Sequence, residues 1–218
     1  MKIFNILYEN VSDNLELNDA INWLKDNNSL KILLSQARSN FEYIATGGTR
    51  EVYGINKDYI IKIALKEKDR NQNKSEVESY YCGGEKYLAK IVAYDPQYYN
   101  WLIMERAGTD AKILNMILAN MFYIPEGDIE PLKWFSLKLS SIDFHDWESL
   151  EKYIKPKFKN WLIGFLHELY KCTSWIDLIE DNIGYRLGNH NIIIIDYGDR
   201  TMETSIDVQQ LKKNFSKI

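Results

Sequence analysis

The chain has 218 residues, of which 45% are hydrophobic, and a formal net charge of −4. This length and composition predict one ordinary domain or two small lobes with a packed core, and they argue against a disordered protein. The net charge gives no overall basic field, so we expect no nucleic-acid partner. The first residues lack a signal-peptide pattern and no apolar run reaches membrane-spanning length, so we expect a cytoplasmic protein without a membrane partner.

The first half of the chain predicts two helices and then short strands. Apolar residues recur at helical spacing over 12–39, with an interruption at Asn27-Asn28. After Phe41 the pattern becomes strand-like, with one further helix and a hairpin. The expected strands cover 41–45, 51–55, 59–65, 88–94 and 98–105, and the expected helix covers 70–82. This order predicts a five-stranded antiparallel sheet with one helix packed on it.

The second half of the chain is mostly helical in pattern. Apolar faces predict helices over 110–122, 132–140 and 157–171. A short strand pair is expected at 183–187 and 191–195, and the tail 199–218 is expected to hold one short helix. Strands followed by helices predict an α+β fold, with a strand-rich amino-terminal lobe and a helical carboxyl-terminal lobe.

Three polar residues around the late hairpin carry the strongest chemical signal. Asn182 precedes the hairpin and Asp196 follows it. If the turn centres near Asn189, these two residues face each other at the open end, and paired strands lie about 5 Å apart. A carboxylate and an amide oxygen in one small volume are suitable ligands for Mg²⁺. Asp177, on the preceding loop, could accept a proton from an attacking hydroxyl.

This arrangement resembles the catalytic and metal loops of the protein-kinase-like superfamily. The stretch Ile-Asp-Tyr-Gly at 195–198 is similar to the form found in aminoglycoside phosphotransferases and in small kinase-like proteins of bacteria and bacterial viruses. The resemblance implies that Asp177 is the catalytic base, that Asn182 is a metal ligand and that Asp196 is the main Mg²⁺ ligand. An ordinary polar loop beside a buried strand is the alternative.

The turn after the first expected strand resembles the kinase Gly-rich loop. Gly47 and Gly48 would permit close backbone approach to the phosphates of ATP. Val52 matches the apolar residue that covers the adenine. Ala45 and Arg50 stand where the family pattern has its first and third glycines, so a plain hairpin turn is the alternative.

Lys62 places a charge inside the apolar strand 59–65, where burial without a partner is costly. The resemblance implies that Lys62 holds the ATP phosphates and needs a glutamate on the next helix. We favour Glu76, because Glu76 and Tyr80 share one helix face at i, i+4, while Glu78 stays open as a partner. The alternative is an edge-strand lysine that points at water.

The last expected strand of the sheet resembles the strand and hinge that bind adenine. By position, Met104 would lie at the back wall of the pocket. Glu105, Arg106 and Ala107 would form the hinge, whose backbone pairs with adenine. A hydrophobic strand with a charged end would have the same pattern.

The chain departs from the family pattern in two places. Trp175 stands where the family has a histidine two residues before the catalytic aspartate. Only 20 residues follow Gly198, too few for the peptide-binding segments of a protein kinase. We therefore expect the acceptor to be recognised by the helices within 110–170, by residues 1–40, or with a partner chain that completes a truncated lobe.

The expected organisation is a helical extension over 1–40, a kinase-like amino-terminal lobe over 41–107 and a truncated helical lobe over 108–218. The expected function is an ATP- and Mg²⁺-dependent phosphotransferase acting on an unknown acceptor, either a small molecule or a protein. Two alternatives stay open. One is an ATP-binding pseudokinase that serves as a regulatory or structural module, and the other is an interaction protein that binds no nucleotide.

Overall fold

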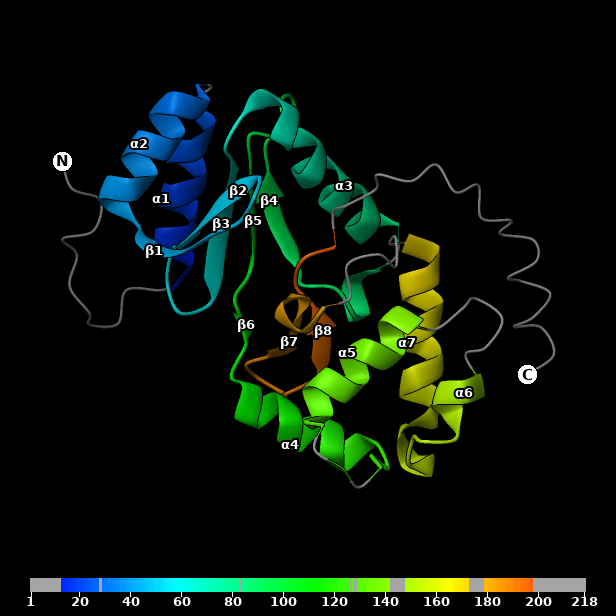
Figure 1. Ribbon diagram of the computed structural model, residues 1–218. Coiled ribbons are helices and arrows are strands. Elements are labelled where there is room, and N and C mark those ends of the chain that lie inside the picture. Colours follow the sequence, from blue (N-terminus) through cyan, green and yellow to red (C-terminus); the bar gives the residue numbers. More distant parts are fainter. Residues whose placement is uncertain are drawn as a thin grey trace.

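The computed structural model describes residues 13–27, 29–82, 84–125, 127, 129–141, 148–172 and 179–197. They form an α+β fold of two lobes, in which a sheet flanked by helices stands beside a helical lobe (Figure 1). The expected fold class is therefore confirmed. Among the described residues, no helix is long and apolar enough to cross a membrane.

Five antiparallel strands build the amino-terminal lobe, in the order β1-β2-β3-β5-β4. Their bounds are Glu42–Thr46 (β1), Arg50–Gly54 (β2), Tyr59–Ala64 (β3), Ile91–Tyr94 (β4) and Trp101–Glu105 (β5). The predicted sheet is confirmed, with strand ends within three residues of those expected. Side chains alternate between the two faces of the sheet, so Ile61 and Ile63 belong to one face and Lys62 to the other.

Two amino-terminal helices cover one face of the sheet (Figure 1). They are α1 (Asp13–Lys25) and α2 (Leu30–Asn40). Their apolar residues share a core with the sheet, formed by Leu17, Ala20, Leu24, Leu33, Ala37, Phe41, Tyr53, Ile55, Ile61, Ile63, Trp101 and Ile103. Residues 17–37 of this segment are thus packed against the strands rather than set apart from them.

Helix α3 (Arg70–Tyr81) lies on the other side of the sheet, after a short 3₁₀ turn, η1 (Glu67–Asp69). Its residues Val77 and Tyr80 belong to the same core cluster as Leu102 of β5 and the residues of the helical lobe. Because of this shared core, α3 joins the sheet to the second lobe.

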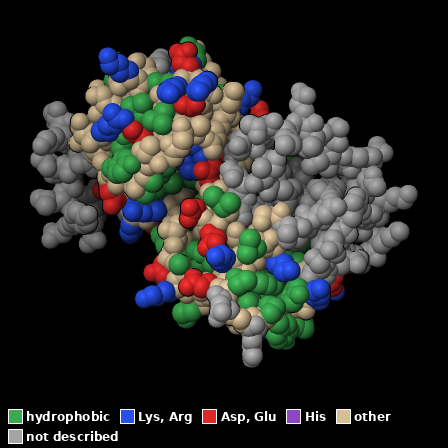
Figure 2. Space-filling model, viewed as in Figure 1, with side chains coloured by type: hydrophobic (Ala, Val, Ile, Leu, Met, Phe, Trp, Pro, Cys, Tyr) green, Lys and Arg blue, Asp and Glu red, His purple; other side chains and the backbone are tan. Residues whose placement is uncertain are grey.

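The helical lobe contains α4 (Ala111–Met121), α5 (Pro131–Ser141), α6 (Glu148–Glu151) and α7 (Lys159–Cys172), with a 3₁₀ turn, η3 (Pro156–Phe158), before α7. The side chain of Asp110 caps α4 by accepting hydrogen bonds from the backbone N–H groups of Lys112 and Ile113. The three predicted helices of this lobe are confirmed, whereas α6 was not expected. On the face shown in Figure 2, hydrophobic side chains gather over the lower part of this lobe, and charges of both signs are interspersed elsewhere.

A second, three-stranded sheet has the order β6-β7-β8. Its strands are Ala107–Gly108 (β6), Ile183–Arg186 (β7) and Ile192–Ile194 (β8). The 3₁₀ turn η5 (Glu180–Asn182) directly precedes β7, and another, η2 (Gly84–Lys86), follows α3. Strand β6 was not predicted, because a strand of two residues has no periodicity. At Gly108 a side chain would overlap the ring of Tyr185, so this pairing requires a glycine.

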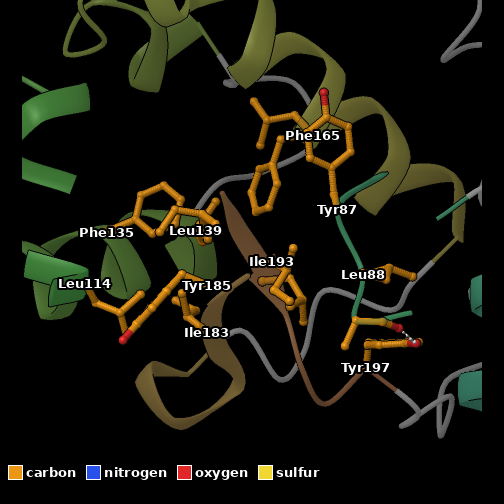
Figure 3. Packing of buried hydrophobic residues seen from close by; sticks show 14 of the residues in the cluster. Tyr87, Leu88, Leu114, Phe135, Leu139, Phe165, Ile183, Tyr185, Ile193 and Tyr197 are labelled. Carbon is orange, nitrogen blue, oxygen red and sulfur yellow. Dashed lines mark hydrogen bonds between the residues drawn. The ribbon is translucent and has the colours of Figure 1, made fainter. Parts of the chain in front are cut away.

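Strand β8 lies in the centre of the larger core (Figure 3). The segment around Tyr87 runs beside it, since the N–H of Ala89 donates to the carbonyl of Ile194 at 2.9 Å and the N–H of Ile194 donates to the carbonyl of Tyr87 at 2.9 Å. Just after the strand, the hydroxyl of Tyr197 donates to the carbonyl of Ala89 at 2.9 Å. These bonds fix the chain on which Asp196 lies.

Replacing Gly164 with alanine should destabilise the protein. A Cβ at this position of α7 would overlap the hydroxyl oxygen of Tyr87, whose ring is 1% exposed and contacts Trp161 and Phe165. Overpacking of this kind costs about 1–3 kcal/mol, against a gain in helix propensity of about 1 kcal/mol. Urea unfolding should therefore show a net loss of up to about 2 kcal/mol.

The matched control for this substitution is Tyr87→Phe/Gly164→Ala. Removing the Tyr87 hydroxyl deletes the atom that lies nearest to the added Cβ. The double variant should recover most of the lost stability. Equal destabilisation of the single and double variants would contradict the proposed steric conflict.

Candidate nucleotide and metal site

Strand β2 directs alternate side chains to opposite sides of the sheet. Glu51 faces α2, where it pairs with Arg38. Arg50 and Val52 face the other side, and Val52 lies opposite Lys62 of β3, so these three side chains share one face. Helix α3 packs against this face and supplies the polar partners.

The predicted contact between Lys62 and Glu76 is confirmed. The Nζ of Lys62 lies 2.9 Å from Oε1 and 3.3 Å from Oε2 of Glu76. Glu76 is 0% exposed, whereas the side chain of Glu78 is 45% exposed and lies 3.9 Å from Lys74. The partner of the strand lysine is therefore Glu76, and the alternative of a solvent-facing lysine is wrong, because Lys62 is buried.

Arg50 is a second buried cation in the same cluster. Its Nη1 lies 2.8 Å from Oε1 of Glu76 and its Nη2 lies 2.6 Å from Oδ1 of Asp196. The residue is only 4% exposed. From the sequence, Arg50 was only a departure from a glycine pattern, and its role in the cluster was not predicted. Strand alternation would have found it, because Arg50 is two residues before Val52 and so shares the face of Lys62.

Two polar side chains of α3 fix this arginine and its aspartate. The Nη1 of Arg50 donates to Oδ1 of Asn73 at 3.4 Å, and the amide of Asn73 donates to the carbonyl of Tyr99 at 2.8 Å. The amide of Gln72 donates to Oδ1 of Asp196 at 3.4 Å. The guanidinium is thus built into a network rather than lying on the surface.

The late hairpin has a register one residue different from the predicted one. Ile183 pairs with Ile194, and the N–H of Ile195 donates to the carbonyl of Asn182 at 2.9 Å. Asn182 therefore lies opposite Ile195, and the expectation that it faces Asp196 directly is wrong. The reason is the loop 187–190, whose four residues place the centre of the hairpin before position 189 instead of on it.

Asp196 lies where the two lobes meet. The Nζ of Lys62 donates to the carbonyl of Ile195 at 2.8 Å, and this bond ties the sheet to the hairpin. Burial acts to raise the pKa of Asp196, but Lys62 and Arg50 outweigh it and hold that pKa well below its usual range. Burial raises the pKa of Glu76, and its contacts with Arg50 and Lys62 limit the rise. Asp196 is consequently a carboxylate at neutral pH.

The oxygen donors of Asp196 and Asn182 are of the kind that binds Mg²⁺. The Asp196 side chain is 36% exposed, and both Arg50 and Gln72 reach its Oδ1. Asn182, on η5 before the hairpin, adds an amide and is 8% exposed. Carboxylate and amide oxygens are the hard donors that Mg²⁺ takes together with phosphate oxygens. Among the described residues, no group of three or more His, Cys, Asp or Glu side chains could hold a metal ion.

The predicted Gly-rich loop is the turn between β1 and β2. The N–H of Gly47 donates to the carbonyl of Arg50 at 2.9 Å. A Cβ at Gly48 would meet no atom within 4 Å, so packing within the chain does not require glycine there.

The predicted hinge follows β5, whose Met104 is fully buried. The N–H of Glu105 donates to the carbonyl of Lys90 at 2.8 Å, and the N–H of Arg106 donates to the carbonyl of Asp58 at 2.7 Å. Ala107 starts β6, where it pairs with β7. The hinge N–H groups at 105 and 106 are therefore already bonded within the chain.

The predicted base, Asp177, lies outside the described residues, as do Trp175, Gly198 and the tail 199–218. Within the described part, the sheet order, α3 on the sheet and the Lys62–Glu76 ion pair are what the resemblance to the kinase-like fold implies.

Several solved structures are similar to this chain at low identity. The APH(2″)-IIa complex with streptomycin and ATP matches at 14% identity and a TM-score of 0.36, over 88% of this chain and 72% of that one. ADP-bound aminoglycoside phosphotransferase APH(2″)-Ib matches at 15% identity and a TM-score of 0.35, over 77% and 70%. Choline kinase LicA from Streptococcus pneumoniae matches at 16% identity and a TM-score of 0.33, over 77% and 68%. No family model and no curated protein matches the chain.

Proposed function

We propose that this chain is an ATP- and Mg²⁺-dependent phosphotransferase whose acceptor is a small molecule or a protein. The observation that carries the proposal is the buried ion pair between Lys62 and Glu76, set beside the partly exposed carboxylate of Asp196. A buried lysine fixed by a glutamate is a positioned cation, and a positioned cation next to a metal carboxylate suits a triphosphate.

Each residue of the site has a distinct task in this proposal. Lys62 binds phosphate oxygens, and Glu76 orients Lys62. Asp196 and Asn182 would hold Mg²⁺, which when bound neutralises charge that develops on the phosphates. Asp177 accepts the proton of the acceptor hydroxyl. Catalysis of phosphoryl transfer depends mainly on such positioning and charge stabilisation.

The nucleotide base and its phosphates would contact a second group of residues. Gly47 and Gly48 would approach the phosphates with their backbone, and a Cβ at Gly48 would meet no atom of the chain within 4 Å. The apolar and backbone contacts with adenine would come from Val52, Met104, Glu105 and Ala107. Because the N–H of Glu105 is bonded to Lys90, adenine contacts at Glu105 would use its carbonyl.

One observation favours the pseudokinase alternative. Arg50 already forms an ion pair with Asp196, the carboxylate that the metal needs. A chain that kept this pair permanently could bind nucleotide through Lys62 and still transfer no phosphate. Phosphate transfer by the wild-type protein would exclude this alternative.

Mg²⁺–ATP should stabilise the wild-type protein in a thermal-shift titration, and Asp196→Ala should abolish the Mg²⁺-dependent part of that stabilisation. Binding to the native state alone stabilises by about 2.7 kcal/mol at a ligand concentration of 100 times Kd, which is a shift of several degrees. Glu67→Ala is the matched control, because the Glu67 side chain is 85% exposed and lies on the same lobe as Lys62. Absence of any wild-type shift at millimolar Mg²⁺–ATP would refute nucleotide binding and favour the interaction protein.

A further inference from the structure

We propose that Arg50 makes this site selective for a metal–nucleotide complex and excludes the free divalent cation. This inference rests on the proposed function and adds a specificity-determining residue to it. It comes from the contacts of Arg50, which occupies a position where the kinase-like pattern has a glycine and no charge.

The charges of the cluster around Arg50 balance. The cluster contains two cations, Arg50 and Lys62, and two carboxylates, Glu76 and Asp196. Burial disfavours the charged form of Arg50, but Glu76 and Asp196 outweigh it and raise the pKa of Arg50 above its ordinary value, so its charge is permanent. Four buried or partly buried groups therefore sum to zero charge. A neutral cluster offers a bare divalent cation no net attraction, and a cation entering it would be repelled by Arg50.

The carboxylate of Asp196, the proposed metal ligand, already forms an ion pair with Arg50. The Nη2 of Arg50 lies 2.6 Å from Oδ1 of Asp196, the distance of a charge-assisted hydrogen bond. Gln72 approaches the same oxygen at 3.4 Å. A metal ion that binds Asp196 must displace or share this guanidinium contact. Without a new partner for the guanidinium, that exchange would leave a buried cation short of one carboxylate.

A triphosphate would supply the guanidinium of Arg50 with a new partner. A guanidinium presents several N–H donors in a planar fork that matches phosphate as well as carboxylate oxygens. Arg50 is the first residue of β2, directly after the turn that carries Gly47 and Gly48. A phosphate bound at that turn could accept the donors of Arg50 while the metal takes Asp196. The same cation thus opposes the free metal and favours the complex.

The network around Arg50 supports a defined position for this cation. Asn73 accepts from Nη1 and is itself anchored on the carbonyl of Tyr99, whose backbone has a left-handed φ of 55°. Asn73 is 0% exposed. The guanidinium can therefore change the partner of its Nη2 while Nη1 stays held by α3.

The test measures binding of Mn²⁺, as a probe for Mg²⁺, to the full chain without nucleotide, from the loss of the free Mn²⁺ signal in electron paramagnetic resonance. Wild type should bind Mn²⁺ weakly. Arg50→Gln should bind it at least about tenfold more tightly, because the cluster then has a net negative charge. Arg50→Lys is the matched control, since it keeps the charge and should bind as weakly as wild type. Circular dichroism checks that each variant is folded.

A second variant tests whether the added Mn²⁺ affinity depends on the Asp196 carboxylate. Arg50→Gln/Asp196→Asn should lose the gained Mn²⁺ affinity, and retention of that affinity would overturn the proposal. Equal affinity of wild type and Arg50→Gln, or equal gains in Arg50→Gln and Arg50→Lys, would also overturn it. Stabilisation of wild type by Mg²⁺–ATP is measured in parallel. If that stabilisation is present and Arg50→Gln gains nothing, only the role of Arg50 fails; if it is absent, the proposed function fails and the selectivity fails with it.

Discussion

Replacing Glu76 with alanine should destabilise the protein more than any other single substitution in the charge cluster. Glu76 is fully buried, and its carboxylate forms ion pairs with both cations of the cluster, Lys62 and Arg50. Its loss removes the carboxylate bonded to Lys62 and leaves Arg50 paired with Asp196. Breaking a buried ion pair in this way costs about 3–5 kcal/mol.

Thermal and urea unfolding measure this effect, and the expected fall in Tm is about 10 °C for a protein of this size. Glu78→Ala is the matched control on the same helix. The Glu78 side chain is 45% exposed, so its removal should change stability by no more than about 0.5 kcal/mol. A Glu76→Ala variant as stable as Glu78→Ala would show that the cluster does not support the fold.

A double variant separates the stabilising role of the ion pair from loss of packing. Lys62→Met removes one cation and leaves Glu76 paired with Arg50, so it should be milder than Glu76→Ala. In Lys62→Met/Glu76→Ala, Arg50 is the one remaining cation of the cluster that has lost its ion pair with Glu76. The double variant should therefore be less destabilised than the sum of the two single variants.

The ion pair could be predicted from the sequence because each residue breaks a local pattern. Lys62 is a charge between isoleucines in a strand, and such a charge needs a partner when the strand is covered. The helical face shared by Glu76 and Tyr80 pointed to the right glutamate, and the structure buries both residues. Regular periodicity likewise predicted the sheet and the longer helices.

The parts that were not predicted depend on tertiary contacts or on short segments. Strand β6 has two residues and exists because β7 pairs with it. The hairpin register depends on the loop 187–190, whose length was not evident from the turn residues alone. Arg50 was missed for a different reason: comparison with the glycine pattern of the family showed only that position 50 lacks a glycine. The alternation of side chains along β2 places the guanidinium on the face of Lys62, where it contacts Asp196.

The two cations also explain how the lobes are joined. Lys62 donates to the carbonyl of Ile195, and Arg50 donates to the carboxylate of Asp196. The sheet is therefore hydrogen-bonded to two adjacent residues at the end of the hairpin. On the opposite side of the hairpin, Arg186 lies 3.0 Å from Glu105 and donates to the carbonyl of Leu88 at 3.1 Å. The proposed metal and hinge residues are thereby connected through one short hairpin. Substitutions at this junction should affect stability and nucleotide binding together.

Asp177→Asn should remove phosphate transfer while leaving nucleotide binding nearly intact. In the proposed function Asp177 accepts the proton of the attacking hydroxyl, and a positioned general base contributes about 10²–10⁴-fold to the rate. Asparagine keeps the shape of the side chain but cannot accept that proton. Mg²⁺-dependent ATP turnover, measured as phosphate transfer or as slow hydrolysis, should therefore fall by this factor.

Asp181→Asn is the matched control, because Asp181 is an exposed acid on η5, only four residues further along the chain. It should keep wild-type turnover. Both variants should show the wild-type thermal shift with Mg²⁺–ATP, since the proposed metal ligands Asp196 and Asn182 are unchanged. If wild type binds Mg²⁺–ATP and Asp177→Asn leaves its turnover unchanged, the residual hydrolysis does not come from a kinase-like base. The pseudokinase function, with Arg50 held on Asp196, would then account for the site better than phosphate transfer does.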